Sequence, residues 1–331
     1  MATLYSFGMD PTRWYSRSKW SSTSDETTWT TGNEAVQGLG ALTTMARGGS
    51  QWVGATSFGE FTVSSDLINW YNYTAENKTW LVNRIAYGNG KFVAVGHEKN
   101  PTNLAETGFI AVSSNGAPAT WVRQWISYGV PVCLFDVQYM GGTNWIAVGN
   151  RDNFSNPIML YSSDNATTWQ SISLPTILTG GIYSVATSGV GTVRVWTGGK
   201  GWVANTTNWQ MNNTVWNLND RVLDSGQSRP VTRLYYRDTF EKTTVVALTG
   251  STAWFSADST QWTSHTQPGY RFLDCVNFYN STNATNTLYL STGGLMQQYT
   301  GFKTLWYPQS TQALTLTGFN NGVQASTQIV V

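Results

Sequence analysis

Few side chains in this sequence have the chemistry of a metal or redox site. The chain contains two cysteines, Cys133 and Cys275, and two histidines, His97 and His265. A zinc site needs three or four cysteine, histidine or carboxylate ligands close together. Both cysteines lie in apolar runs, which indicates small buried core residues. We therefore expect no bound metal and no cofactor.

The sequence also offers few side chains for acid–base or nucleophilic catalysis. Only 18 residues are Asp or Glu, and several of them stand in turns, so a convergent carboxylate pair for glycoside hydrolysis is hard to assemble. There is no glycine-rich phosphate loop and no Ser–His–Asp set. The densest polar and aromatic cluster covers residues 235–238 (Tyr-Tyr-Arg-Asp), which we interpret as the end of a strand and a turn. The chain is predicted not to be an enzyme, and no catalytic residue is assigned.

The secondary-structure elements that position these residues can be inferred from a repeat of tryptophans. A tryptophan closes a short polar turn seven times, at intervals of 40 to 53 residues: Trp29, Trp70, Trp121, Trp169, Trp209, Trp262 and Trp306. This is close to the length of one four-stranded propeller blade. A blade cannot bury both faces of its sheet alone and must stack on neighbours. The repeat predicts an all-β fold, a seven-bladed β-propeller with four-stranded antiparallel blades, as a single domain over residues 1–331.

The strands of one repeat are clearest around Trp121. Short runs rich in β-branched and aromatic residues lie at 83–87, 91–96 and 108–114, and Trp121 opens the fourth strand. Both chain ends are expected to close the ring. Residues 3–8 resemble a second strand, so residues 313–318 are predicted to supply the missing inner strand of the first blade. Residues 323–331 are then a surplus strand, which pairs at the seam or adds to a neighbouring subunit; we favour the seam.

The turns themselves carry a resemblance. Residues 162–169, Ser-Ser-Asp-Asn-Ala-Thr-Thr-Trp, fit the pattern S-x-D-x-x-x-T-W and resemble the Asp-box (BNR) family. The other copies are looser, and the copy before Trp306 has no acid. An aspartate or asparagine precedes the tryptophan at Asp25, Asp66, Asn115, Asp164, Asn205 and Asp258. Such a side chain accepts backbone N–H bonds within the turn, and the resemblance implies that these turns are structural.

The Asp-box family includes sialidases, so glycoside hydrolysis must be weighed. Sialidases carry an Arg-Ile-Pro segment ahead of the first box, three arginines that bind a carboxylate, an aspartate acid/base and a Tyr–Glu nucleophile pair. This chain has no Arg-Ile-Pro segment, and Arg13 and Arg17 precede the first box without that context. A sialidase-like hydrolase is therefore the least favoured interpretation.

Long insertions indicate where a ligand would bind. They fall at residues 97–107, 151–157 and 212–230, in connections that a propeller places on one face, opposite the polar turns. Loops of this length are more often functional than short connections are, although drift in uncontacted loops is an equal alternative. Exposed aromatics there would suit sugar or protein contacts. The candidate binding-face residues are His97, Asn103, Arg151, Phe154, Trp216 and Arg221.

Composition excludes several partners. Charged residues make up 11% of the chain and the formal net charge is +1, without the basic stripe that nucleic-acid binding requires. No apolar run approaches the roughly 20 residues that span a bilayer, so no membrane insertion is expected. The first residues lack the pattern of a secretory signal. Either the protein is used without secretion or a signal has been removed.

Two roles remain. A nearly neutral chain rich in Thr, Ser, Asn, Gly and Trp, with degenerate Asp-box repeats, resembles the propeller modules of tailed-phage virion proteins. That resemblance implies a tail or capsid-surface component, assembled in the host cytoplasm. It would serve as a platform for other virion proteins or for host attachment through a surface glycan or receptor. The alternative is a secreted, extracellular glycan-binding lectin.

Overall fold

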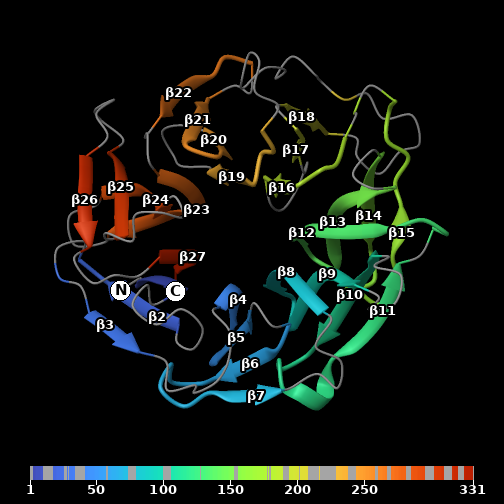
Figure 1. Ribbon diagram of the computed structural model, residues 1–331, viewed down its shortest axis with the longest axis horizontal. Coiled ribbons are helices and arrows are strands. Elements are labelled where there is room, and N and C mark those ends of the chain that lie inside the picture. The colour runs from blue at the N-terminus through green and yellow to red at the C-terminus, as the bar shows by residue number, and fades with distance from the viewer. Residues whose placement is uncertain are drawn as a thin grey trace.

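The computed structural model arranges antiparallel sheets around a common centre (Figure 1). The structure describes residues 3–9, 18–25, 28, 30–33, 42–56, 59–73, 80–99, 106–126, 128–152, 156–176, 178, 180–188, 194–200, 202–207, 216, 229–237, 244–257, 260–266, 270–280, 285–294, 302–308, 315–319 and 324–330. Within these residues the strands pair into seven sheets, six with four strands and one with three. The prediction of an all-β fold is confirmed.

We number the sheets in chain order and give their strands from the centre outward. Sheet 1 contains β27 (Gln324–Val330), β1 (Leu4–Met9), β2 (Ser18–Thr23) and β3 (Thr30–Asn33). Sheet 2 contains β4 (Leu42–Gly48), β5 (Gln51–Thr56), β6 (Phe61–Ser64) and β7 (Tyr71–Tyr73). Sheet 3 contains β8 (Trp80–Gly88), β9 (Lys91–Lys99), β10 (Glu106–Ser113) and β11 (Val122–Ile126). Sheet 4 contains β12 (Val132–Gly141), β13 (Asn144–Arg151), β14 (Asn156–Ser162) and β15 (Gln170–Ser171).

The remaining sheets continue the same order. Sheet 5 contains β16 (Ser184–Thr187), β17 (Val195–Gly198) and β18 (Val203–Thr206). Sheet 6 contains β19 (Arg233–Arg237), β20 (Thr244–Thr249), β21 (Thr252–Ser256) and β22 (Thr263–Thr266). Sheet 7 contains β23 (Tyr270–Asn280), β24 (Thr285–Gly294), β25 (Phe302–Pro308) and β26 (Thr315–Phe319). Among the described residues the one helical element is the 3₁₀ turn η1 (Pro118–Thr120), and no helix there is long and apolar enough to cross a membrane.

The hydrophobic core is divided among the boundaries between consecutive sheets. One cluster joins sheets 2 and 3 through Val53, Phe61, Phe92 and other buried residues. The next joins sheets 3 and 4 around Trp145. Comparable clusters join sheets 1 and 2, 4 and 5, 5 and 6, and 6 and 7. Sheets 2 to 6 therefore each bury both of their faces by stacking on two neighbours, as the repeat predicts.

The innermost strands are bent by β-bulges at corresponding places. The register shifts between Leu42 and Thr44 in β4, and by the same one-residue step in β8, β12 and β23. A bulge adds one residue to a strand and turns the following side chains. The bulged residue Thr43 donates to the carbonyl of Val82 in the next sheet at 3.3 Å. These bulges therefore link neighbouring sheets near the centre.

The two chain ends share one sheet. The favoured pairing of residues 323–331 at the seam is confirmed, but the inner strand of the first sheet is not the predicted segment. β27 pairs antiparallel with β1, with Leu4 opposite Val330. Residues 315–319 form β26, the outermost strand of sheet 7, paired with β25. The assignment of residues 313–318 to the first sheet was wrong. Two C-terminal segments could each form the inner strand of the first sheet, and the longer, terminal one pairs with β1.

Two residues of the predicted turns lie in strands. Trp306 is inside β25, opposite Tyr289 of β24, and does not close a turn. Asn205 is buried within β18, opposite Trp196 of β17. Both assignments were wrong because spacing from a tryptophan cannot distinguish a strand position from the turn that follows it.

Candidate functional site

The polar turns are organised by the carboxylate or amide that follows the third strand of a sheet. Asp164 Oδ1 accepts backbone N–H bonds from Thr167 at 3.1 Å and Thr168 at 2.9 Å, and Oδ2 accepts the Thr168 hydroxyl at 2.6 Å. These bonds, led by the Thr168 hydroxyl, lower the pKa of Asp164 to about 2. Asp66 makes the same kind of turn with the N–H groups of Ile68 and Asn69, which lower its pKa to about 2.

Two further turns share this geometry. Asn115 Oδ1 accepts from the N–H of Ala117 at 2.9 Å and from the Thr120 hydroxyl at 2.8 Å. Asp25 Oδ1 accepts from the N–H of Thr28 at 2.7 Å. Trp29, Trp209 and Asp258 lie outside the described residues.

A serine two residues before the acid completes the turn. Ser162 Oγ accepts the N–H of Ala166 at 3.0 Å, and Ser113 Oγ accepts that of Gly116 at 2.8 Å. The donating N–H belongs to a residue with left-handed backbone, φ 63° at Ala166 and 72° at Gly116. Gly116 lies so close to the preceding sheet that a Cβ there would clash with the Val53 side chain. This serine is the first residue of the motif, but its role as an acceptor was not predicted from the sequence.

The tryptophans that close the turns pack on the preceding sheet. The Trp121 ring stacks on Phe61 of sheet 2, with centroids 4.2 Å apart and planes 17° apart. Trp169 packs against the cluster between sheets 3 and 4, and Trp262 against the cluster between sheets 5 and 6. Trp70 packs against the cluster shared with sheet 1. These side chains join sheets, and they are half-buried rather than offered to solvent.

The predicted binding-face residues divide into three groups. Arg151 ends β13 and is exposed, as predicted. His97 and Trp216 were predicted to lie in exposed loops, which is wrong: His97 is a buried residue of β9, and Trp216 is 6% exposed and packs between sheets 4 and 5. Asn103, Phe154 and Arg221 lie outside the described residues. Large side chains in long connections pack inward where the boundary between two sheets has apolar surface that they can bury.

A hollow of about 440 Å³ opens beside Arg151, on the face that carries the second-to-third and fourth-to-first connections. We call this the loop face. The Arg151 guanidinium carbon lies 5.4 Å from the ring centre of Tyr128. Residues 171–176 also line the hollow, and Asn156, another lining residue, donates to Asp152. An aromatic ring, a guanidinium and several hydroxyls around a small hollow could hold a polar ligand or an extended peptide.

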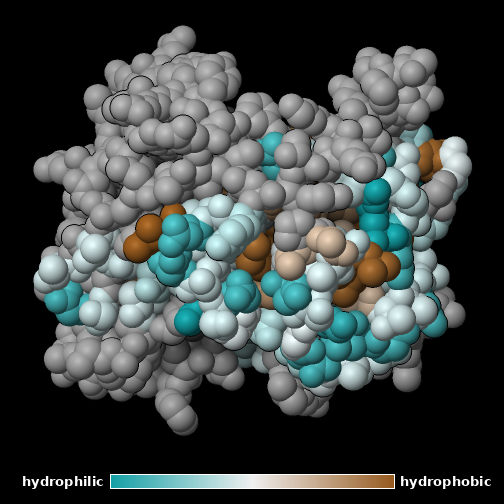
Figure 2. Space-filling model, turned by 90° about the horizontal axis from the view of Figure 1, so that it is seen from below, coloured by the Kyte–Doolittle hydropathy of each residue, from teal (hydrophilic) through white to brown (hydrophobic). Residues whose placement is uncertain are grey.

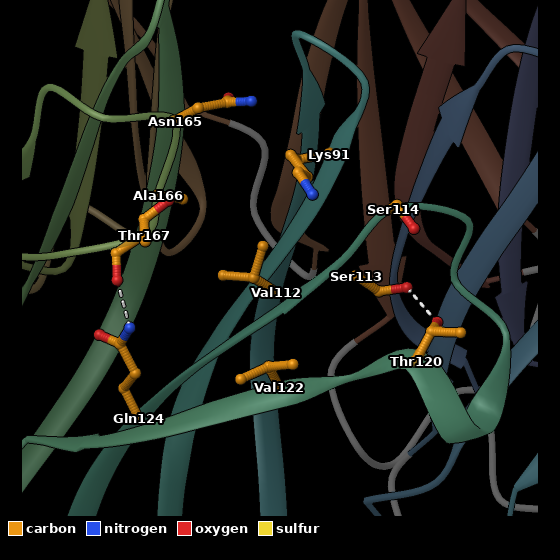
Figure 3. Close-up of a pocket in the computed structure, with 10 residues that line it drawn as sticks. All are labelled: Lys91, Val112, Ser113, Ser114, Thr120, Val122, Gln124, Asn165, Ala166 and Thr167. Carbon is orange, nitrogen blue, oxygen red and sulfur yellow. Dashed lines mark hydrogen bonds between the residues drawn. The ribbon is translucent and has the colours of Figure 1, made fainter.

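A second hollow, of about 360 Å³, lies on the opposite face, where the polar turns meet (Figure 3). Lys91, the first residue of β9, points into it, and Val112 and Val122 form its floor. The Gln124 side chain closes it by donating to the backbone carbonyl of Thr167 in sheet 4. The second hollow therefore lies at the boundary of sheets 3 and 4, and the first lies at the end of sheet 4, between the connections that precede and follow that sheet.

Apolar side chains reach the surface on both faces of the outermost strand of sheet 3: Val122 lines the hollow toward sheet 4, and Trp125 lies on the side of Phe109, toward sheet 2. Val122 and Trp125 of β11, the outermost strand of sheet 3, are 67% and 46% exposed. Figure 2, which looks at the side of the molecule near β7 and β11, shows hydrophobic residues among hydrophilic ones. Arg123 lies between two rings, with its guanidinium carbon 3.5 Å from the ring centre of Trp80 and 4.4 Å from that of Trp125. Such stacking fixes the arginine and the exposed ring together.

The charged residues that converge are at the centre, and they neutralise one another. Arg233 Nε lies 2.7 Å from Asp274 Oδ1, and its Nη1 lies 3.6 Å from Asp136 Oδ2. Arg84 Nε lies 3.5 Å from Asp136 Oδ1. The four side chains come from β8, β12, β19 and β23, and the aspartates are almost completely buried.

Backbone groups hold this central network in place. Asp136 also accepts the N–H groups of Val137 and, from sheet 5, Val185. Burial raises the pKa of Asp136, although the charges of the two arginines act to lower it. Burial also lowers the pKa of Arg84. Burial also opposes the charge of Arg233, but Asp274 and Asp136 outweigh it and raise its pKa. All of these groups are engaged with each other, which suits a structural role.

The aromatic cluster at residues 235–238 has the structural setting expected for it. Tyr235 and Tyr236 lie in β19, and the Tyr236 ring stacks on Trp196 at 4.7 Å. Asp238 lies outside the described residues. Within the part of the chain that the structure describes, no three histidine, cysteine or carboxylate side chains group as metal ligands.

Comparison with known proteins identifies the fold class. No known protein family and no individual curated protein matches the sequence. YCF48 from Cyanidioschyzon merolae matches in structure, with a TM-score of 0.58 at 14% identity, over 88% of this chain and 93% of that one. YCF48 bound to D1 peptide matches with a TM-score of 0.55 at 14% identity, over 83% and 80%. BBS1N in complex with ARL6DN, soaked with mercury, matches at 0.52 and 12% identity, over 83% and 78%. These neighbours are β-propellers, and this chain has a β-propeller fold.

Proposed function

We propose that this chain is a seven-bladed Asp-box propeller of four-stranded blades, closed by strands from both chain ends. We propose further that it is a non-enzymatic component of a phage virion, a tail or capsid-surface protein that binds other virion proteins or the host surface. The observation that carries the proposal is β11, the outermost strand of sheet 3, which exposes Val122 on one face, beside the second hollow, and Trp125 on the other.

Three other features support an interaction platform. The converging charges at the centre are buried and mutually paired, so they do not form an open catalytic pocket. The low charge of the whole chain suits a β-rich assembly surface. One structural neighbour is a propeller bound to a peptide, so peptide binding is compatible with this architecture.

A glycan-binding lectin is the second candidate, favoured by one observation. The loop-face hollow combines an aromatic ring, Tyr128, with an exposed Arg151 and several hydroxyls. Aromatic rings and polar groups that converge on a small hollow are typical of sugar sites.

The test is incorporation into particles. Antibody against the purified chain is used for immunogold labelling of purified particles from the source virus, after complementation with tagged variants. We expect the wild type and Tyr71→Ala, a change at an exposed β7 residue, to incorporate. The double variant Val122→Thr/Trp125→Ala should incorporate at least several-fold less while keeping its thermal midpoint.

Absence of the wild-type chain from the particles would overturn the virion proposal. A glycan array with the isolated protein then separates the alternatives. Binding that Arg151→Met abolishes would establish the lectin instead, and glycoside release by the wild type would establish a hydrolase.

A further inference from the structure

Two side-chain bridges between sheets 3 and 4 border the second hollow (Figure 3). In one bridge, Asn165 Nδ2 donates to the carbonyl of Asn89, in the turn after β8, at 3.2 Å. In the other, the Gln124 amide donates to the carbonyl of Thr167. Asn165 Oδ1 also accepts the indole N–H of Trp145 at 3.2 Å. The fold therefore holds the walls of the hollow in place before any ligand enters, which lowers the cost of binding.

Lys91 brings a positive charge into this hollow. Its side chain is half-buried and points inward from the start of β9 (Figure 3). Among the described residues that line the hollow, Lys91 is the only charged one. It forms no ion pair with any residue that the structure describes. A half-buried ammonium group has lost part of its hydration, so an entering anion would give it a charge-assisted hydrogen bond.

The polar turns beside the hollow do not neutralise this charge. Asp164 directs both carboxylate oxygens at Thr167 and Thr168 of its own turn, and it is not among the described residues that line the hollow. Asn115 takes the corresponding place in the turn of sheet 3 and carries no charge. The formal charge inside the hollow is therefore that of Lys91.

The floor of the hollow is aliphatic. Val112 of β10 and Val122 of β11 are directly opposite each other in sheet 3. Val122 is 67% exposed, and covering it would remove apolar surface from water. The volume of about 360 Å³ is near the lower end of the range for ligand pockets, roughly 300–1,000 Å³. It suits a group the size of one or two amino-acid residues.

The hydroxyls around the hollow are largely engaged with the protein. Those of Ser113 and Thr120 bond to each other, and that of Thr167 donates to the carbonyl of Asp164 at 2.8 Å. No aromatic ring is among the described lining residues. A sugar presents several hydroxyls that need partners, and it would find few here. A carboxylate on a short apolar stem matches both the ammonium group and the floor.

We propose that the second hollow binds a peptide carboxylate carried on an apolar stem. The carboxylate is either the C-terminus of a partner chain that ends in an apolar residue or a glutamate beside an apolar residue. Lys91 donates to the carboxylate, and the stem covers Val112 and Val122. This inference rests on the proposed function for the source of the peptide. Binding is measured on the isolated chain, so it can fail while the chain still incorporates into particles, and the reverse.

The test is an NMR titration of the ¹⁵N-labelled full chain. The probes are isovalerate, a small carboxylate with a branched apolar stem, and isovaleramide, its uncharged counterpart. Isovalerate should shift the Gln124 side-chain amide and the backbone N–H signals of Ser113 and Thr167, which line the hollow. Isovaleramide should bind about tenfold or more weakly, because the charge-assisted hydrogen bond is lost. Equal binding of the two probes, or no shift at these residues, would overturn the proposal.

Lysine variants show which charge is responsible. Lys91→Met keeps the length of the side chain and removes its charge, so isovalerate should bind about tenfold or more weakly. Lys91→Arg keeps the charge and should keep the binding. Lys200→Met, at an exposed residue between β17 and β18, is the matched control and should leave the affinity unchanged. Unchanged affinity in Lys91→Met would contradict the site. The comparison of the two probes on the wild type does not depend on the folding of any variant.

Two peptides then separate the sources of the carboxylate. Acetyl-Gly-Gly-Val-Leu with a free carboxylate presents a chain end, and acetyl-Gly-Val-Glu-Val-amide presents an internal glutamate. The tighter binder identifies the source, and its uncharged counterpart (the C-terminal amide or the glutamine peptide) should bind about tenfold or more weakly. Glucuronate tests an acidic sugar. If it binds more tightly than both peptides, and Lys91→Met removes that binding, the peptide assignment is overturned.

Discussion

At the scale of the residue, an acid contributes to this protein by ordering a short stretch of backbone. Asp66 and Asp164 are exposed, yet each carboxylate accepts two backbone N–H bonds. The pKa of each acid falls to about 2 because hydrogen bonds favour the charged form, first the Thr168 hydroxyl and then the backbone N–H groups at Asp164, and the N–H groups of Asn69 and Ile68 at Asp66. The acid therefore stabilises the turn only while it is ionised.

The sign of the pH dependence follows. A carboxylate whose pKa is lower in the folded than in the unfolded chain stabilises the fold above the unfolded value of about 3.9, and that stability is lost as pH falls toward 2. Asp164→Asn keeps one acceptor oxygen and removes the charge. We expect the variant to melt below the wild type at pH 6 and the difference to shrink between pH 4 and pH 2. Differential scanning calorimetry measures it, and a difference that stays constant across this range would contradict an origin in the carboxylate charge.

Residue types alone could predict these turns but not the inward packing of other side chains. The spacing of aspartate, asparagine and tryptophan predicted the hydrogen-bonded turns at Asp66, Asn115 and Asp164. It could not predict that His97 and Trp216 are buried, because burial depends on which sheet boundary has space for the ring. Because both residues lie in long polar stretches of the sequence, the sequence indicated that their side chains are exposed.

At the scale of the element, the bulges of the inner strands decide which side chains meet. Asp136 follows the bulge in β12 and Asp274 follows the bulge in β23. Arg84 follows the bulge in β8. The central network depends on this register, and its members are 41 to 190 residues apart in the chain. No local pattern marks them, so the sequence could not have predicted it.

Asp136 is the member whose loss should cost most. Asp136→Asn leaves Arg84 and Arg233 without one carboxylate and removes an anion that accepts two backbone N–H bonds. Removing one partner of a buried ion pair costs about 3–5 kcal/mol, so we expect a loss of that size in the free energy of unfolding in urea. Asp152→Asn, at an exposed turn, is the control and should change it by less than about 0.5 kcal/mol. Equal effects of the two variants would show that the network contributes nothing.

At the scale of the whole molecule, the first and last strands of the chain are joined in one sheet. The repeat of tryptophans predicted stacked β units, and the propeller fold is confirmed by the structural neighbours. The choice between the two C-terminal segments could not be made from sequence, because residues 315–319 and 324–330 are both plausible strands. Only the pairing with β1 separates them.

Removal of β27 tests this joint. A chain truncated after residue 319 loses the strand that pairs with Leu4 to Met9, so we expect a lower melting temperature and increased binding of a hydrophobic dye. A synthetic peptide of residues 320–331 should restore both when added in excess, since strand addition supplies the missing main-chain bonds. A peptide with the same composition in scrambled order is the control. If the truncated chain melts like the full one, β27 does not hold the first sheet.

The pairing of β1 with β27 has a consequence for engineering. Leu4 stands directly opposite Val330, so a short peptide linker could connect the ends, and new termini could be cut into the exposed hairpin at Asn89 and Gly90. In such a circular permutant the present joint would become an ordinary covalent hairpin. The sheet that contains the new termini would then be the first to open when the molecule is pulled apart.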